Sequence, residues 1–186
     1  DARHRHLVSS TRFVFNYAMA ANEFGAEDAA LREDYLKAVR HGVAYLRDKH
    51  FDAQSGGYAW TIRDGQPEDL SQQCYGAAFV LLAYSCARKA DIGEARGWMG
   101  EVWDLLEQRY WEPQHGLYRD EAVIDPQSGD WQFSGYRGQN ANMHMCEAML
   151  ARVCMDQALR HRPQRGEVGG VAPRIAGTTS VTDTKR

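Results

Sequence analysis

The spacing of apolar residues along the chain predicts five helices. Apolar positions recur every three or four residues, the period of a helix that buries one face, in residues 7–24, 31–48, 71–88, 93–110 and 138–154. The segments 31–48 and 93–110 are amphipathic, whereas 71–88 is apolar on almost every side and should be covered by its neighbours. The chain is therefore predicted to be all-α, with one deeply buried helix.

A motif of eight residues occurs twice, 60 positions apart. Residues 51–58 read FDAQSGGY and residues 111–118 read WEPQHGLY, with an aromatic residue, an acid, Gln, Gly and Tyr in step. In each copy an amphipathic helix precedes the motif and a more buried helix follows it. This repeat predicts an α/α toroid, in which outer helices surround inner ones and the long loops lie on one side. An irregular helical bundle with two similar loops is the alternative.

Composition and charge are those of one globular domain. The chain has 186 residues, 44% of them hydrophobic and 25% charged, enough to bury a sizeable core. A formal net charge of −3 argues against a surface for nucleic acid or anionic lipid. The sequence contains no run of 18 apolar residues that would predict a membrane span. We therefore expect a cytoplasmic protein without nucleic-acid or membrane partners, and the oligomeric state stays open.

Cysteine and glycine positions indicate neither a metal nor a nucleotide. No cysteines form a CxxC pair, and all lie in apolar helical segments, so we expect buried free thiols in a reducing compartment. They are Cys74, Cys86, Cys146 and Cys154. The glycines form neither a phosphate-binding loop nor a dinucleotide fingerprint. We predict no metal site and no cofactor.

The composition changes towards the end of the chain. Residues 158–186 are rich in Gly, Pro, Thr and Arg and contain no aromatic residue. Such a segment cannot form another amphipathic helix, so we expect it to be disordered. The predicted folded domain is residues 1–157, followed by a non-homologous tail.

One predicted helix carries a polar stripe at its beginning. Asn140, taken as the N-cap, His144 and Glu147 are spaced four and three residues apart and fall on one helical face. Polar groups on an otherwise apolar wall are costly unless they are hydrogen-bonded or meet a ligand. A histidine satisfied by a backbone carbonyl is the simpler interpretation, but its two polar neighbours favour a pocket with His144 as the leading catalytic candidate.

Other helix beginnings supply further candidates around the same pocket. In a toroid, Arg12 would point into the cavity that contains His144, and its guanidinium group suits a pair of sugar hydroxyls or a developing enediolate oxygen. Gln73 and Tyr75 occupy the matching position on segment 71–88, although Tyr75 is equally typical of a core. The loop aromatics form a stacking rim or pack within the loops; they are Tyr58, Trp60, Tyr118, Trp131 and Tyr136. The loop acids Asp120, Glu121 and Asp125 are expected to be solvated.

These segments together resemble the N-acylglucosamine 2-epimerase family, over about residues 7–152 and closest to its aldose–ketose isomerase branch. The matching pieces are Ser10–Arg12, Gly56–Trp60, Gln73–Phe79 and Tyr136–Ala148. The resemblance implies an (α/α)6 barrel that acts at C1 and C2 of a free monosaccharide through a cis-enediolate, without metal or nicotinamide.

The resemblance also implies roles for individual residues. Arg12 and Asn140 would hold substrate oxygens and stabilise the enediolate, and His144 would assist ring opening. Glu147, Tyr75, Gln73 and Trp60 are expected to bind the substrate.

The chain departs from the family pattern in length. Family chains are roughly twice as long, and their two proton-transferring histidines lie in the second half of the barrel, where nothing after His144 matches. We therefore expect part of a barrel with impaired isomerase or epimerase activity. The alternatives are a toroid glycoside hydrolase that uses carboxylates, and a non-catalytic sugar-binding or degenerate remnant.

Overall fold

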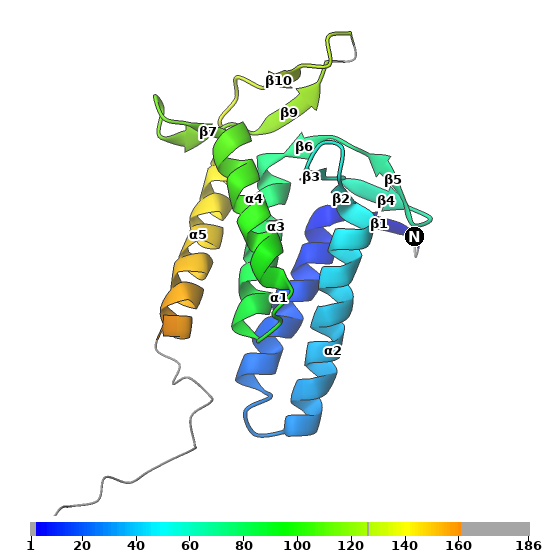
Figure 1. Ribbon diagram of the computed structural model, residues 1–186, viewed down its shortest axis with the longest axis vertical. Helices are drawn as coiled ribbons and strands as arrows, with labels where there is room; N and C mark the ends of the chain where they lie inside the picture. The colour runs from blue at the N-terminus through cyan, green and yellow to red at the C-terminus, as the bar shows by residue number, and fades with distance from the viewer. Residues whose placement is uncertain (1–2, 126, 161–186) are drawn as a thin grey trace, which may run out of the picture.

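The computed structural model of the protein describes residues 3–125 and 127–160, which form five α-helices and ten short strands (Figure 1). The helices are α1 (Leu7–Glu23), α2 (Ala29–Tyr45), α3 (Cys74–Lys89), α4 (Ala95–Arg109) and α5 (Gln139–Arg160). All five predicted helices are therefore confirmed. The ends differ by a few residues, most at α5, which continues to Arg160 through the boundary predicted at residue 157. The rest of the predicted tail lies outside the described residues.

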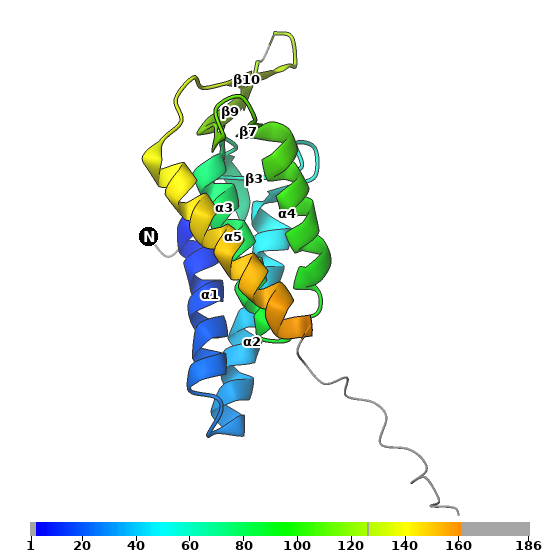
Figure 2. The same cartoon turned by 90° about the vertical axis from the view of Figure 1, so that its left-hand side faces the viewer.

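Helix α3 lies at the centre of the arrangement, in contact with α1, α4 and α5 (Figures 1 and 2). Its side chains are almost all buried, with Ala78, Val80 and Leu81 fully enclosed. Helix α2 packs on α1 and α4 packs on α3, so each forms the outer member of a pair. The predicted alternation of inner helices (α1, α3, α5) and outer helices (α2, α4) is thus present as an arc.

The repeated motif folds into two equivalent hairpins. Strand β2 (Phe51–Asp52) pairs with β3 (Gly57–Tyr58), and β7 (Trp111–Glu112) pairs with β8 (Leu117–Tyr118), each with its aromatic residue opposite its tyrosine. Gly56 and Gly116 occupy the same place in each turn with φ of 68° and 64°, a conformation that glycine adopts without steric cost. The periodicity read from the sequence therefore corresponds to a structural repeat.

The long loops contain two further antiparallel sheets that the hydrophobic pattern did not predict. One has the order β1-β4-β5, from His4–His6, Thr61–Arg63 and Gln66–Asp69; the other has the order β10-β9-β6, from Trp131–Phe133, Glu121–Ile124 and Gln72–Gln73. Strands of two to four residues are too short to show an alternating pattern. All four sheets gather at the end where the inner helices begin, as expected of a toroid with its loops on one side (Figure 1).

The four cysteines are free, as predicted, but only part of their predicted burial is correct. Cys74 is buried and Cys86 is half-buried, whereas Cys146 and Cys154 are exposed on α5. The outer faces of α1 and α5 also expose apolar side chains, including Met19 and Leu150. Among residues 3–125 and 127–160, no helix combines the length and the apolar character needed to cross a bilayer.

Candidate functional site

A pocket of about 430 Å³ opens at the end of the fold where the inner helices begin. Four of the residues predicted from the sequence line it, namely Trp60, Gln73, Tyr75 and Asn140. They come from the β3–β4 loop, the entry to α3 and the first turn of α5, which are far apart in the sequence. The remaining lining residues are Asp120, Glu121, Ser134, Tyr136 and Ala141. Tertiary folding therefore assembles a polar cavity from the segments that carry the predicted site.

A row of aromatic rings connects this pocket to the other predicted residues. The Tyr75 ring centroid lies 6.3 Å from that of Trp60 and 5.1 Å from that of Phe79. Two polar groups then meet at Phe79: the His144 ring centroid lies 4.5 Å from its centroid, and the Arg12 guanidinium carbon lies 5.3 Å from it. Arg12 and His144 therefore lie on one surface formed by α1, α3 and α5. Neither lines the pocket itself, and the predicted cavity that both would face stays a prediction.

Phe79 was not predicted as a site residue, although its position in the sequence carries a signal for one. Phe79 follows Tyr75 by four residues on α3, so both rings lie on one face of that helix. Its side chain is only 3% exposed. A large aromatic residue on an inner helix, one turn after a candidate site residue, therefore predicts a side chain that supports the site.

His144 and Glu147 form a pair instead of lining the pocket together. Nδ1 of His144 lies 2.8 Å from Oε2 of Glu147, and the imidazole edge also contacts Tyr75 at 5.2 Å between centroids. A carboxylate at Nδ1 favours the tautomer that donates from Nδ1, which leaves Nε2 as an acceptor. The Glu147 side chain is 54% exposed. The structure thus assigns Glu147 a contact that orients His144 and does not place it among the pocket residues.

Arg12 is exposed and its guanidinium group has no acidic partner among the residues that the structure describes. Its contact is the face of Phe79, a cation–π arrangement that leaves the N–H donors available. Five fixed donors directed away from an aromatic surface suit the oxygens of an uncharged or anionic ligand.

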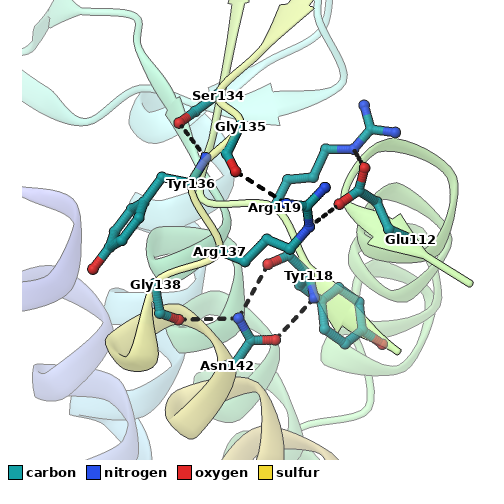
Figure 3. A network of polar contacts seen from close by, with 9 residues as sticks. All are labelled: Glu112, Tyr118, Arg119, Ser134, Gly135, Tyr136, Arg137, Gly138 and Asn142. Atoms are coloured by element: carbon teal, nitrogen blue, oxygen red, sulfur yellow. Dashed lines mark hydrogen bonds and ion pairs between the residues drawn. The ribbon is translucent and has the colours of Figure 1, made fainter. Parts of the chain in front are cut away.

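The start of α5 is clamped to the neighbouring loop by Asn142 (Figure 3). Its amide oxygen accepts a hydrogen bond from the Tyr118 N–H at 2.8 Å, and its amide nitrogen donates to the carbonyls of Tyr118 and Gly138 at 3.1 and 3.0 Å. Because α5 begins at Gln139, Asn140 lies in its first turn and the predicted N-cap role of Asn140 is wrong. The helix thus begins two residues earlier than an N-cap at Asn140 would allow, and Asn140 lines the pocket from its first turn.

A second clamp is ionic. Glu112 is buried and pairs with Arg119 at 2.9 Å and with Arg137, which also donates to the Gly135 carbonyl (Figure 3). The hydrogen bond from Arg137 lowers the pKa of Glu112 below its ordinary value, and the charge of Arg119 acts in the same direction. Both ends of the loop from residue 119 to residue 137 are thereby held against the hairpin of β7 and β8.

Replacing Asn142 by alanine is expected to reduce the free energy of unfolding by about 1–3 kcal/mol, because the buried N–H and C=O of Tyr118 lose their partners. Urea unfolding followed by circular dichroism measures this change. The matched control is Asn140→Ala, two residues earlier and exposed, which should alter stability by less than about 0.5 kcal/mol. Equal stabilities for the two variants would contradict the clamp.

The loop acids do not behave as one group. Asp125 accepts hydrogen bonds from the N–H groups of Gln127 and Ser128 in a turn, away from the pocket. Asp120 and Glu121, which we expected to be solvated, line the pocket. Of the loop aromatics, Tyr58 and Tyr118 belong to the core, whereas Trp60 and Tyr136 reach the pocket. Sequence alone offered no signal that separates these acids, since all three lie in one segment that the sequence predicts to be a loop.

Relatives of known structure have the same fold. The chain resembles a crystal structure of D-mannose isomerase with a TM-score of 0.73 and 46% identity, over 86% of this chain and 38% of that chain. A cellobiose 2-epimerase from Spirochaeta thermophila superposes with a TM-score of 0.68 at 23% identity, which concerns the fold alone. The predicted all-α fold, part of an α/α toroid, is therefore confirmed.

Sequence relatives agree with the structural ones. The D-mannose isomerase of Marinomonas mediterranea is 48% identical over 152 residues, which are 81% of this chain and 36% of that protein. The chain thus spans a little over a third of the length of these relatives. A stretch of 37 residues, 20% of this chain, is also 62% identical to the chorismate synthase of Xanthomonas euvesicatoria, a likeness that concerns a short segment only.

The N-acylglucosamine 2-epimerase family model matches residues 1–177, nearly the whole chain. This match extends beyond residue 157, and the domain boundary proposed there stays a prediction. Together with the D-mannose isomerase likeness and the inner-helix pocket, the match shows that the chain belongs to the N-acylglucosamine 2-epimerase family.

Proposed function

We propose that this chain provides one wall of a sugar site for an aldose–ketose isomerase or 2-epimerase that acts on a free monosaccharide of the mannose–fructose type. The observation that supports it most is the pocket in which Trp60, Gln73, Tyr75 and Asn140 meet. Indole and phenol rings stack on the apolar face of a sugar, while amides exchange hydrogen bonds with its hydroxyls. The names of the N-acylglucosamine 2-epimerase family and of the D-mannose isomerase relative point to the same class of reaction.

The proposed reaction begins with ring opening. A proton reaches the ring oxygen O5, the O1 hydroxyl loses its proton, the C1–O5 bond breaks and C1 becomes an aldehyde. A base then removes the C2 proton, the C–H electrons form a C1=C2 double bond, and the negative charge moves to O1. Return of a proton to C2 on the opposite face restores the C1 aldehyde and gives the epimer. Transfer of the O2 proton to O1, followed by protonation at C1, leaves the carbonyl at C2 and gives the ketose.

In these reaction steps, the residues of this chain act as hydrogen-bonding and polarising groups. Nε2 of His144 faces substrate oxygens during ring opening, and Glu147 fixes its tautomer through Nδ1. The Arg12 guanidinium group and the Asn140 amide stabilise the enediolate oxygen, because charged and dipolar donors act most strongly where negative charge develops. The family resemblance assigns proton transfer at C1 and C2 to two histidines without a match in this sequence. We therefore propose that this chain binds the sugar but converts it slowly or not at all.

Titration of the full chain with D-mannose in a calorimeter, with fructose assayed in the same sample, tests the proposal. Saturable binding with little fructose is expected, and His144→Ala should weaken binding by about tenfold, the loss of one hydrogen bond. A cooperatively folded chain that binds neither mannose, glucose nor fructose would overturn the proposal. Rapid turnover that His144→Ala abolishes would instead show that proton transfer needs no residue outside this chain.

A further inference from the structure

Asp120 is held rigidly at the wall of the pocket by its backbone. Its carbonyl accepts a hydrogen bond from the N–H of Cys74 at 2.8 Å, at the start of α3. Its N–H donates to the carbonyl of Tyr136 at 3.2 Å, just before α5. The residue therefore links the beginnings of two inner helices, and its side chain enters the pocket between them.

The Asp120 carboxylate lacks the partners that a buried acid normally has. Its Oδ1 atom is inaccessible to solvent, and no hydrogen-bond donor lies within reach among the described residues. The two arginines that flank its loop, Arg119 and Arg137, both pair with Glu112. A carboxylate that receives no hydrogen bond is costly in such a place. Because Oδ1 is enclosed, a ligand in the pocket would donate to Oδ2, which is not enclosed in this way, and would offset part of that cost.

Gly138 shows that the carboxylate has a defined place. A β-carbon added at Gly138 would lie 2.4 Å from Oδ2 and 2.9 Å from Oδ1 of Asp120. Any side chain at this position would therefore displace the carboxylate. The glycine before α5 thus provides the space that the carboxylate occupies, on the same wall as the Asn140 amide.

We propose that Asp120 is a specificity-determining residue that accepts hydrogen bonds from hydroxyl groups of the bound sugar. This inference rests on the proposed function and adds a carboxylate acceptor to the arginine, histidine and amide groups named above. An ionised carboxylate can only accept, and hydrogen bonds to it are about twice as strong as those between neutral groups. A hydroxyl is the donor that a free sugar offers. The carboxylate therefore distinguishes a sugar from its deoxy analogue at that position.

The test compares the full chain with its Asp120→Asn variant by calorimetric titration with D-mannose. Asparagine has the same shape as aspartate but lacks the charge, and the dissociation constant should rise by about 10- to 100-fold, the range for a hydrogen bond to a charged group. The matched control is Asp130→Asn, an exposed acid on the same loop outside the pocket, with less than about a twofold change expected.

A panel of monodeoxy mannoses identifies the contact. One analogue should bind the unaltered chain more weakly than mannose, yet bind Asp120→Asn as well as mannose does, because the missing hydroxyl and the missing charge belong to one interaction. If Asp120→Asn does not fold, the panel with the unaltered chain decides: uniform affinity across all analogues overturns the assignment.

The outcomes separate the two proposals. Equal affinity of Asp120→Asn and the unaltered chain for mannose overturns the role of Asp120 and leaves the sugar site in place. No binding of any monosaccharide by the folded, unaltered chain overturns the sugar site, and the role of Asp120 with it.

Discussion

Replacing Phe79 by alanine is expected to lower the free energy of unfolding by about 3–5 kcal/mol, the usual cost of removing a buried aromatic ring and leaving a cavity. The ring is 3% exposed and lies against Tyr75, Phe15 and His144. It also supports the Arg12 guanidinium group. Loss of Phe79 therefore removes the surface on which both Arg12 and His144 rest. Urea unfolding and mannose titration of the same sample measure the two consequences.

Phe79→Leu separates the functional effect from instability. Leucine restores most of the apolar volume, so the expected loss of stability is only about 1–2 kcal/mol, but it removes the ring face that Arg12 contacts, worth about 0.5–1 kcal/mol at an exposed site. Mannose binding should weaken by about threefold or more in this folded variant. Unchanged affinity in Phe79→Leu would show that the ring has no part in positioning the site.

Mild acid is expected to destabilise the fold through His50. This imidazole is fully buried; its Nδ1 donates to the Ala59 carbonyl at 2.9 Å and its Nε2 accepts from the Ser10 hydroxyl at 3.0 Å. Burial lowers the pKa of His50 below its ordinary value of 6.5, and the nearby His6, whose own pKa is lowered by burial, acts in the same direction. Below pH 6.5 the unfolded chain therefore binds a proton that the folded chain does not accept.

The sign of the effect follows from linkage. Stability is at its full value above pH 6.5 and falls as the pH drops below it, since the unfolded state then binds more protons than the folded state. Urea midpoints measured from pH 8 to pH 5 should show this decline.

Two histidine variants provide the controls. His50→Gln should be less stable at pH 8 by about 1–3 kcal/mol, because a flexible amide replaces a buried ring that meets Ser10 and Ala59 in fixed geometry, but its stability should depend less on pH. His41→Gln removes an exposed imidazole and should keep the full decline. A decline as steep in His50→Gln as in the unaltered chain would contradict the role assigned to His50.

Much of the fold could be predicted because it depends on local patterns. Apolar residues on every side of α3 predict that this helix is buried, and the amphipathic spacing of α2 and α4 predicts that each exposes one face. The repeat at residues 51–58 and 111–118 predicted two equivalent loops and hence the alternation of inner and outer helices. The strands beside these loops could not be predicted, because pairs such as β6 with β9 join residues about 50 positions apart and each strand is too short to show a period.

The sequence by itself determined which residue types we propose for the site: an arginine, a histidine, two amides and aromatic residues near the beginnings of inner helices. Only the tertiary structure decided which of these residues lie together and which groups they contact. It brought Trp60, Gln73, Tyr75 and Asn140 into one cavity and left the Asp120 carboxylate without a donor beside Gly138. The physical reason is that helix periodicity is encoded within a few residues. The partners of a polar group in a loop, by contrast, depend on where distant segments come together.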